Sequence, residues 1–257
     1  MLRKKSVLGC LIFLAAVTVA AQVEVPSSRP ELHTIVQRME QAAQENRDQY
    51  KAYIVTREYR LFGGDQEKSG SKVVADISFT PPKSKEFRIT ETAGSPRGEN
   101  VVRHILENEQ RATESGQAPG AVVSDNYEFT TAGEESLDGH PCYVLGLTPK
   151  RKEKSLIVGR AWIDKQTFLV RRVQGEMAKM PSWWIKSVQV TLDFNDVQGM
   201  WMQTSTVAHA DVRVFGPHTL QENAVKVRTG SVVAELNKNK PRRSFRTAEA
   251  VLGSFEH

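Results

Sequence analysis

The feature that most constrains the fold is an alternation of apolar and polar residues with a period of two, which begins near Tyr50 and continues through most of the chain. Segments with this alternation are residues 50–62, 71–80, 85–93, 126–150, 159–176, 184–197, 200–216 and 218–227. Such alternation predicts strands that bury one face. We count about ten strands with hairpin-length connections. Short connections predict an antiparallel sheet in meander order.

Turn-forming residues stand between these segments. Asp138-Gly139 is a residue pair favoured by two-residue hairpins, and Gln198-Gly199 occupies an equivalent place further along. Gly63-Gly64-Asp65 and Pro81-Pro82 separate the early segments, and a turn is expected at 164–167. Asp164 opens that last turn, where an aspartate side chain commonly bonds the backbone.

Only two segments have helical spacing. In the first, Ser28 is the expected N-cap and Glu31 follows three residues later, as in a capping box, before apolar residues recur from Leu32 to Ala43. The second is an amphipathic segment over residues 98–114. A sheet of about ten strands curls strongly, and two amphipathic helices can close its concave face. The expected fold class is α+β: a strongly curved antiparallel sheet, or half-barrel, closed by helices around an apolar cavity.

The first residues are typical of a secretory signal peptide. A basic patch at residues 3–5 precedes an apolar run over 7–21, and the run ends in a small-x-small pattern that predicts cleavage before Gln22. An uncleaved anchor and a lipidated Cys10 are the alternatives. We therefore expect a signal peptide at 1–21, one half-barrel domain at 22–235 and a loosely ordered basic tail at 236–257.

Charge and cysteine content limit the function classes. The full chain has a net charge of +5, and removal of residues 1–21, which hold three basic and no acidic residues, leaves +2. That value gives no argument for nucleic-acid binding. Cys142 is then the one remaining cysteine, so no internal disulfide is expected. Cys142 can be interpreted either as a small buried residue or as a reactive thiol. This composition fits the bacterial periplasm.

Two segments resemble a known superfamily. "CYVLGLTPK" at 142–150 is a strand that ends in Pro-Lys, and "GRAWIDKQTFLVRRVQGE" at 159–176 begins with Gly-Arg-x-Trp-Ile-Asp before a hairpin. Together they resemble the central hairpins of the LolA/LolB/RseB-like periplasmic lipoprotein carriers. "SWWIKSVQV" and "VRVFG" are similar to uncharacterised lipoprotein-sorting-like members.

The resemblance implies a non-catalytic protein without a cofactor that binds an acylated lipoprotein or another lipid, with transient membrane contact. It also implies an arginine that locks a helical lid, for which Arg60, Arg88 and Arg103 are the candidates. The helical segment at 98–114 and the basic tail depart from the plain carrier pattern.

We predict the cavity lining from alternate strand positions. The predicted lining residues are Tyr53, Val55, Phe79, Phe87, Leu145, Leu147, Trp162, Phe168 and Trp184. Trp183 and Trp184 are adjacent, so they point to opposite sides of a strand. They fit rim packing of the sheet, a grip on an acyl chain or contact with a membrane interface.

Other function classes have weaker support. The chain contains no Gly-x-Ser-x-Gly, His-Glu-x-x-His or phosphate-loop motif, which leaves a hydrolase as a minor alternative. His209 and Asp211, with His218 nearby, are the best metal candidate, and a solvated strand face is the competing interpretation. The second function hypothesis is an envelope regulatory or scaffold module. It would bind a protein partner through an exposed sheet edge at "TLQENAVKV", residues 219–227.

Overall fold

A computed structural model describes residues 30–63, 70–116, 118–230 and 232–235. The chain divides into two units, Met1–Pro30 and Glu31–His257, and the fold below is that of the second unit. Its elements are α1 (Leu32–Asp48), β1 (Tyr53–Gly63), β2 (Ser71–Thr80), β3 (Ser84–Ala93), α2 (Pro96–Glu114), β4 (Tyr127–Leu137), β5 (His140–Pro149), β6 (Ile157–Asp164), β7 (Val170–Met177), β8 (Ile185–Val197), β9 (Met200–Val212), β10 (Gly216–Thr229) and β11 (Val232–Glu235).

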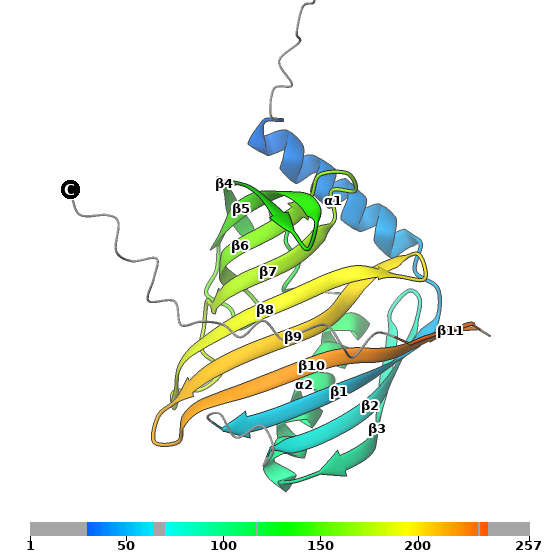
Figure 1. The fold of residues 1–257 in the computed structure, drawn as a ribbon, viewed down its shortest axis with the longest axis vertical. Coiled ribbons are helices and arrows are strands. Elements are labelled where there is room, and N and C mark those ends of the chain that lie inside the picture. The colour runs from blue at the N-terminus through cyan, green and yellow to red at the C-terminus, as the bar shows by residue number, and fades with distance from the viewer. Residues whose placement is uncertain (1–29, 64–69, 117, 231, 236–257) are drawn as a thin grey trace, which may run out of the picture. The chain divides into compact units, whose positions relative to one another are not determined.

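The strands form a single antiparallel sheet in the order β3-β2-β1-β10-β9-β8-β7-β6-β5-β4, and β11 pairs with β10 (Figure 1). The sheet is open, because β3 and β4 lie at its two ends. The predicted fold class, a large open antiparallel sheet with two helices, is confirmed.

The predicted meander order is correct only within two blocks. β1–β3 form one meander and β4–β10 form another, and the blocks join through β1 and β10, where Thr56 faces Lys226. The connection through α2 sends β3 and β4 to opposite ends of the sheet. The predicted free edge at residues 219–227 is therefore wrong, since β10 pairs with β1 on one side and with β9 on the other.

The short turns form where the residue pairs predicted them. Asp138 and Gly139 have φ of 52° and 87° and join β4 to β5. Gln198 and Gly199, with φ of 56° and 80°, join β8 to β9. Positive φ at both central residues gives the turn twist that matches antiparallel strands.

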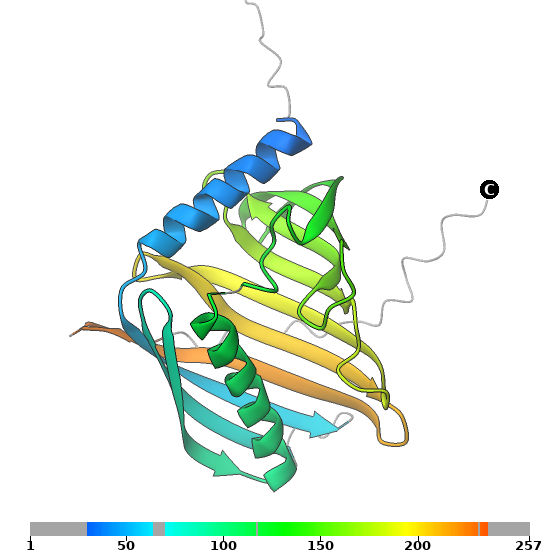
Figure 2. The same cartoon turned by 180° about the vertical axis from the view of Figure 1, so that it is seen from behind.

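Both helices cover the same face of the sheet, here called the inner face (Figure 2). α1 places Ile35 and Met39 in a buried cluster with side chains of β4–β7, such as Leu145. α2 places Val102 and Leu106 in a second buried cluster with β1, β2, β9 and β10. A series of cross-strand neighbours on the inner face connects the two clusters. From β1 to β7 its residues are Tyr59, Glu222, Thr206, Leu192 and Val173.

The helix ends differ in part from the predicted ends. α1 begins at Leu32 with Glu31 as its N-cap residue and without a side-chain cap, so Glu31 is not the third helical residue of a capping box. Ser28 lies outside the described residues. α2 begins two residues before its predicted start, because Ser95 accepts a hydrogen bond from the Arg97 N–H and caps it. The signal peptide, the turn at Gly64-Asp65 and the basic tail also lie outside the described residues.

Candidate functional site

A row of half-buried small and apolar residues crosses the middle of the inner face. Gly175 of β7 faces Val190 of β8, Val190 faces Ala208 of β9, Ala208 faces Leu220 of β10, and Leu220 faces Leu61 of β1. All five are only partly covered, whereas the cluster residues under each helix are fully buried. We call these five residues the central row. The row offers apolar contact area and no reactive group.

Four of the predicted lining residues lie on the inner face in the region of α2. Val55 is buried in the second cluster, and Tyr53 and Phe87 pack against that cluster. Phe79 stacks on Tyr53, with 5.3 Å between ring centroids. Tyr50 also lies edge-on to both rings. These aromatics form one group near the start of β1, whereas the central row crosses β1 near its end, at Leu61.

Three more predicted residues lie in the cluster under α1. Leu145 and Leu147 project from β5, and Phe168 lies in the turn between β6 and β7. The guanidinium of Arg38 in α1 stands 4.1 Å from the centroid of the Phe168 ring. The inner face therefore collects seven of the nine residues, in two groups. Their role in ligand binding stays a prediction.

Trp162 and Trp184 do not join these groups. Leu145 faces Ala161, so the adjacent Trp162 points to the outer face, where it packs with Cys142 and Val144. Its indole N–H donates to Glu135 at 2.9 Å. Trp184 lies in the connection between β7 and β8 and is 43% exposed.

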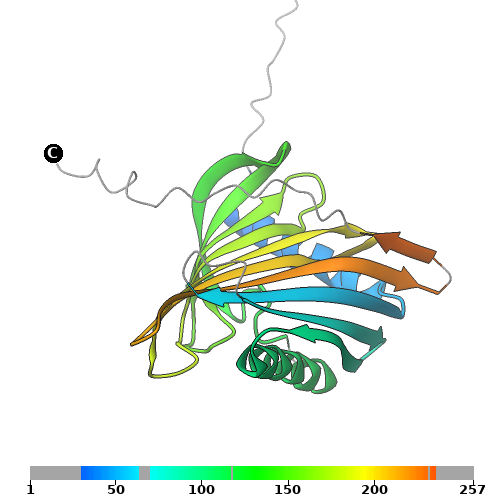
Figure 3. The same ribbon diagram turned by 60° about the horizontal axis from the view of Figure 1, so that its bottom comes forward.

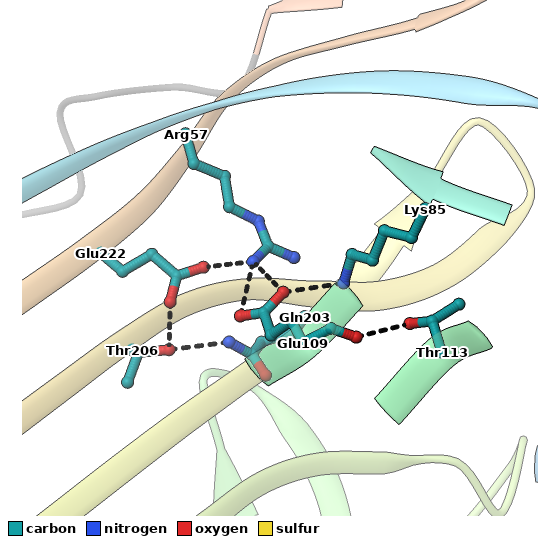
Figure 4. Close-up of polar contacts among 7 residues, drawn as sticks. All are labelled: Arg57, Lys85, Glu109, Thr113, Gln203, Thr206 and Glu222. Carbon is teal, nitrogen blue, oxygen red and sulfur yellow. Dashed lines mark hydrogen bonds and ion pairs between the residues drawn. The ribbon is translucent and has the colours of Figure 1, made fainter. Parts of the chain in front are cut away.

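The sequence analysis missed a buried ion cluster beneath α2 (Figure 4). Arg57 of β1 lies 3.0 Å from a Glu222 carboxylate oxygen on β10 and 3.1 Å from a Glu109 oxygen on α2. Lys85 of β3 also contacts Glu109, at 2.7 Å. Thr206 of β9 donates to Glu222 at 3.0 Å. The cluster joins four strands and the helix, and its two acidic and two basic groups balance in charge.

The pKa values of the two carboxyl groups of the cluster are shifted in opposite directions. Burial by itself would raise the pKa of Glu109, but Arg57 and Lys85 together hold that pKa below its ordinary value. Burial dominates at Glu222 and raises its pKa, even though Arg57 acts in the opposite direction. Ionisation is therefore less favourable for the Glu222 carboxyl group than for that of Glu109.

Arg57 connects the sheet to α2 through its pair with Glu109. The predicted candidates have other contacts: Arg60 pairs with Glu58 on its own strand, Arg88 with Asp76 on the neighbouring strand, and Arg103 with Glu99 inside α2. Arg57 occupies a position where the alternation of β1 calls for an apolar side chain, between Val55 and Tyr59. A charged residue at a position where the alternation predicts an apolar one is the sequence signal by which the role of Arg57 could have been predicted.

Side-chain hydrogen bonds to β9 hold the end of α1. The Asn46 amide donates to the Trp201 carbonyl and accepts from the Trp201 N–H, both at 2.8 Å. The Tyr50 hydroxyl, just after the helix, donates to the same carbonyl at 2.6 Å. Each helix is thus attached to the sheet by an apolar cluster and by a small set of polar contacts.

The residues considered for a metal site lie on different faces of the sheet, and the cysteine considered for a reactive thiol is buried. His209 and Asp211 share the outer face, but His218 faces Ala210 and so belongs to the other side, which corrects the predicted approach. In the described ranges no three histidine, cysteine, aspartate or glutamate side chains are placed to hold a metal ion. Cys142 is fully buried, and burial raises the pKa of its thiol.

Asp164 supports a turn, as its position predicts. Its carboxylate accepts hydrogen bonds from the Gln166 and Thr167 N–H groups and pairs with Arg171. Burial by itself would raise the pKa of Asp164, but these contacts lower it below its ordinary value. Neither described helix is long and apolar enough to cross a membrane.

A family model described only as "Uncharacterized protein" matches residues 120–214. No curated protein sequence matches the chain. The solved structures similar to this chain include the three that follow. A LolA superfamily protein from Nitrosomonas europaea is 14% identical, with 77% of this chain and 94% of that chain covered and a TM-score of 0.40. The likeness is one of fold.

The other two have comparable values. A DUF1329 family protein from Desulfovibrio piger is 15% identical, with 80% of this chain and 96% of that chain covered and a TM-score of 0.39. A putative outer membrane lipoprotein-sorting protein domain from Vibrio parahaemolyticus is 14% identical, with the same shares covered and a TM-score of 0.37.

Proposed function

We propose that the protein binds a lipidic ligand, either a lipid or the acyl chains of a lipoprotein, on the inner face of its sheet, in the bacterial periplasm and without catalysis. The observation that carries this proposal is the central row. Its five residues are only half-buried; Val190 packs against the first cluster, and Leu61 and Leu220 pack against the second. A face that served only as protein core would be buried along its whole width.

The energetics favour such a ligand. Burial contributes about 0.8 kcal/mol per methylene, so a long acyl chain gains on the order of 10 kcal/mol before the entropy cost of ordering it. This gain needs apolar area and no specific polar partner. The absence of a reactive group along the row is consistent with binding.

The helices that flank the row have few polar attachments. On α2, Glu109 makes ion pairs to β1 and β3, and α1 is held at its end by Asn46. A ligand can therefore be admitted by a shift of one helix without breaking the strand ladder. Catalysis would require groups that the row does not contain.

The test is mass spectrometry under non-denaturing conditions. The chain from Gln22 onward contains the whole compact unit, and it would be purified from an envelope fraction without detergent. Ala208→Trp fills the middle of the row, and Val158→Trp adds the same ring to a position on the outer face that is 52% exposed. We expect mass additions that extract into organic solvent in the original protein and in Val158→Trp, and their loss in Ala208→Trp. Near-ultraviolet circular dichroism would establish that both variants are folded.

Two results would count against the proposal. One is a clean ligand-free mass for the original protein that persists after incubation with lipid extract. The other is full retention of the additions in folded Ala208→Trp, which would place the ligand elsewhere.

A further inference from the structure

Four large apolar side chains project into solvent at one end of the sheet. Trp183 and Trp184 belong to the connection between β7 and β8 and are 84% and 43% exposed. Val214 and Phe215 belong to the turn between β9 and β10 and are 96% and 69% exposed. Among the described residues, the other two large apolar side chains exposed to this degree, Val101 and Val158, lie on separate elements. We call these four residues the tip.

The two connections form one surface. The Arg213 N–H donates to the Trp184 carbonyl at 2.8 Å, and the Arg213 guanidinium donates to the Trp183 carbonyl at 3.1 Å. Ile185 at the start of β8 faces Val212 at the end of β9. The two connections lie together at one end of the sheet, where β8 begins and β9 turns into β10 (Figure 3). These bonds hold the backbone of Trp183 and Trp184 against the turn between β9 and β10.

Basic residues surround the tip. Residues 178–186 and 210–217 contain Lys179, Lys186 and Arg213 and one acidic residue, Asp211, which gives these segments a net charge of +2. Lys186 pairs with Asp211 at 3.2 Å. Exposed tryptophan and phenylalanine beside basic side chains is the combination that binds the interface of an anionic bilayer.

We propose that the tip docks the protein on an anionic phospholipid bilayer, with the rings of Trp183 and Phe215 in the headgroup region. The area favours a bilayer over a protein partner. Large aromatic side chains bury up to about 150–250 Å² each, and Trp184 and Phe215 are only 43% and 69% exposed, so the four side chains offer less than the roughly 800 Å² per partner of a standard protein interface. A bilayer accepts a small protruding surface of this kind.

Docking at the tip would also orient the inner face. The inner-face side chains of β9 run Thr206, Ala208, Ala210 and Val212 toward the turn, and Ala208 belongs to the central row. The row is therefore connected along one strand to the docked end. The docking proposal does not depend on the ligand, and each can fail without the other.

The test is flotation with extruded vesicles of phosphatidylcholine, with and without phosphatidylglycerol, using the chain from Gln22 onward. Trp183→Ser combined with Phe215→Ser should lower the partition onto phosphatidylglycerol vesicles by at least about tenfold. Val101→Ser combined with Val158→Ser removes exposed apolar side chains elsewhere and should leave the partition unchanged. Lys179→Gln should lower it by about fivefold on phosphatidylglycerol vesicles and have no effect on neutral ones.

The proposal is overturned if the original protein floats with neither kind of vesicle, or if the tip variant floats as well as the control variant. A concentration-dependent dimer that the tip variant abolishes, together with an absence of flotation, would assign the tip to contact between copies of the chain. Circular dichroism of the variants should match the original protein, since all the substituted side chains are exposed.

Discussion

Replacement of Arg57 by methionine gives the sharpest test of the buried ion cluster. The side chain of Arg57 is 9% exposed and that of Glu222 is 8% exposed, so water cannot replace the lost contact. Glu109 keeps Lys85 as a partner at 2.7 Å. Glu222 keeps only the Thr206 hydroxyl among the contacts of this cluster. Arg57→Met therefore leaves one buried carboxylate without a counter-charge.

The expected loss follows from this geometry. Removing one partner of a buried ion pair costs about 3–5 kcal/mol, because the remaining charge stays buried. The lower end applies here, about 3 kcal/mol, since Glu222 can accept a proton and keep its hydroxyl contact. Arg57→Met combined with Glu222→Leu removes both charges and should recover most of the loss. Arg172→Met, at a pair with Asp193 whose side chains are 24% and 29% exposed, should cost no more than about 1 kcal/mol.

Urea unfolding followed by tryptophan fluorescence measures these differences. At pH 7 the midpoint of Arg57→Met should fall well below that of Arg172→Met. At lower pH the gap should narrow as Glu222 takes up a proton. If the two single variants lose equal stability, or if adding Glu222→Leu makes Arg57→Met worse, then the cluster does not act as a charge-compensated unit.

The raised pKa of Glu222 determines how this residue makes the folding stability of the unmodified protein depend on pH. Its pKa in the folded protein is raised above the ordinary 4.5, so the folded state holds this proton more tightly than the unfolded state does. Its stability contribution is therefore fully present below pH 4.5 and is lost as pH rises through the folded pKa. The stability of Glu222→Gln relative to the original protein should accordingly increase as pH rises from 4.5. A difference that is constant with pH would contradict the raised pKa.

Three further substitutions test other contacts. Asn46→Ala removes two hydrogen bonds to Trp201 and should cost about 1–3 kcal/mol in urea unfolding, with faster amide exchange in α1 than in α2. Gly98→Ala would place a Cβ 2.3 Å from the Ser71 Cβ, so it should destabilise the protein by about 1–3 kcal/mol in thermal melts; adding Ser71→Gly should restore only part of that loss, because it also removes the hydroxyl that bonds the Ser95 backbone. Asp164→Ala should cost about 2 kcal/mol at pH 7, and because the pKa of Asp164 is lowered, the cost measured by urea unfolding should shrink as pH falls below the ordinary 3.8.

The sequence predicted the elements well because their signals are local. The period of two identifies the strands, and residue pairs such as Asp138-Gly139 place the turns within a few residues. The pairing of β1 with β10 has no local signal, because Thr56 and Lys226 are far apart in the chain. Meander order was the natural expectation, and the crossover through α2 replaced it at this one place.

The residues of the candidate site could be predicted from the sequence only where the strand register could be predicted. Leu145 and Leu147 were correctly assigned to the same face of β5. Trp162 was assigned to the lining from the alternation along its strand, but the register places Ala161 opposite Leu145, and a shift of one residue reverses the face. The central row combines two small residues, Gly175 and Ala208, with three larger apolar ones and has no sequence signature, so only the structure identifies it. Arg57 and Glu222 interrupt apolar alternation, and that interruption is a signal that sequence reasoning can use.

The topology explains why a helix must cover the inner face. β3 and β4 lie at opposite ends of the sheet, so the chain between them has to cross one face, and α2 makes that crossing on the inner side (Figure 2). The helix is therefore tied at both ends: Ala93 ends β3 just before it, and Tyr127 begins β4 after a connecting segment. Because Glu109 lies on α2 away from both ties, its pairs with Arg57 and Lys85 are the contacts best placed to set how far the helix sits from the sheet. A lipid that lifts α2 must break these pairs in a buried setting, so ligand entry and the protonation of this cluster should be linked.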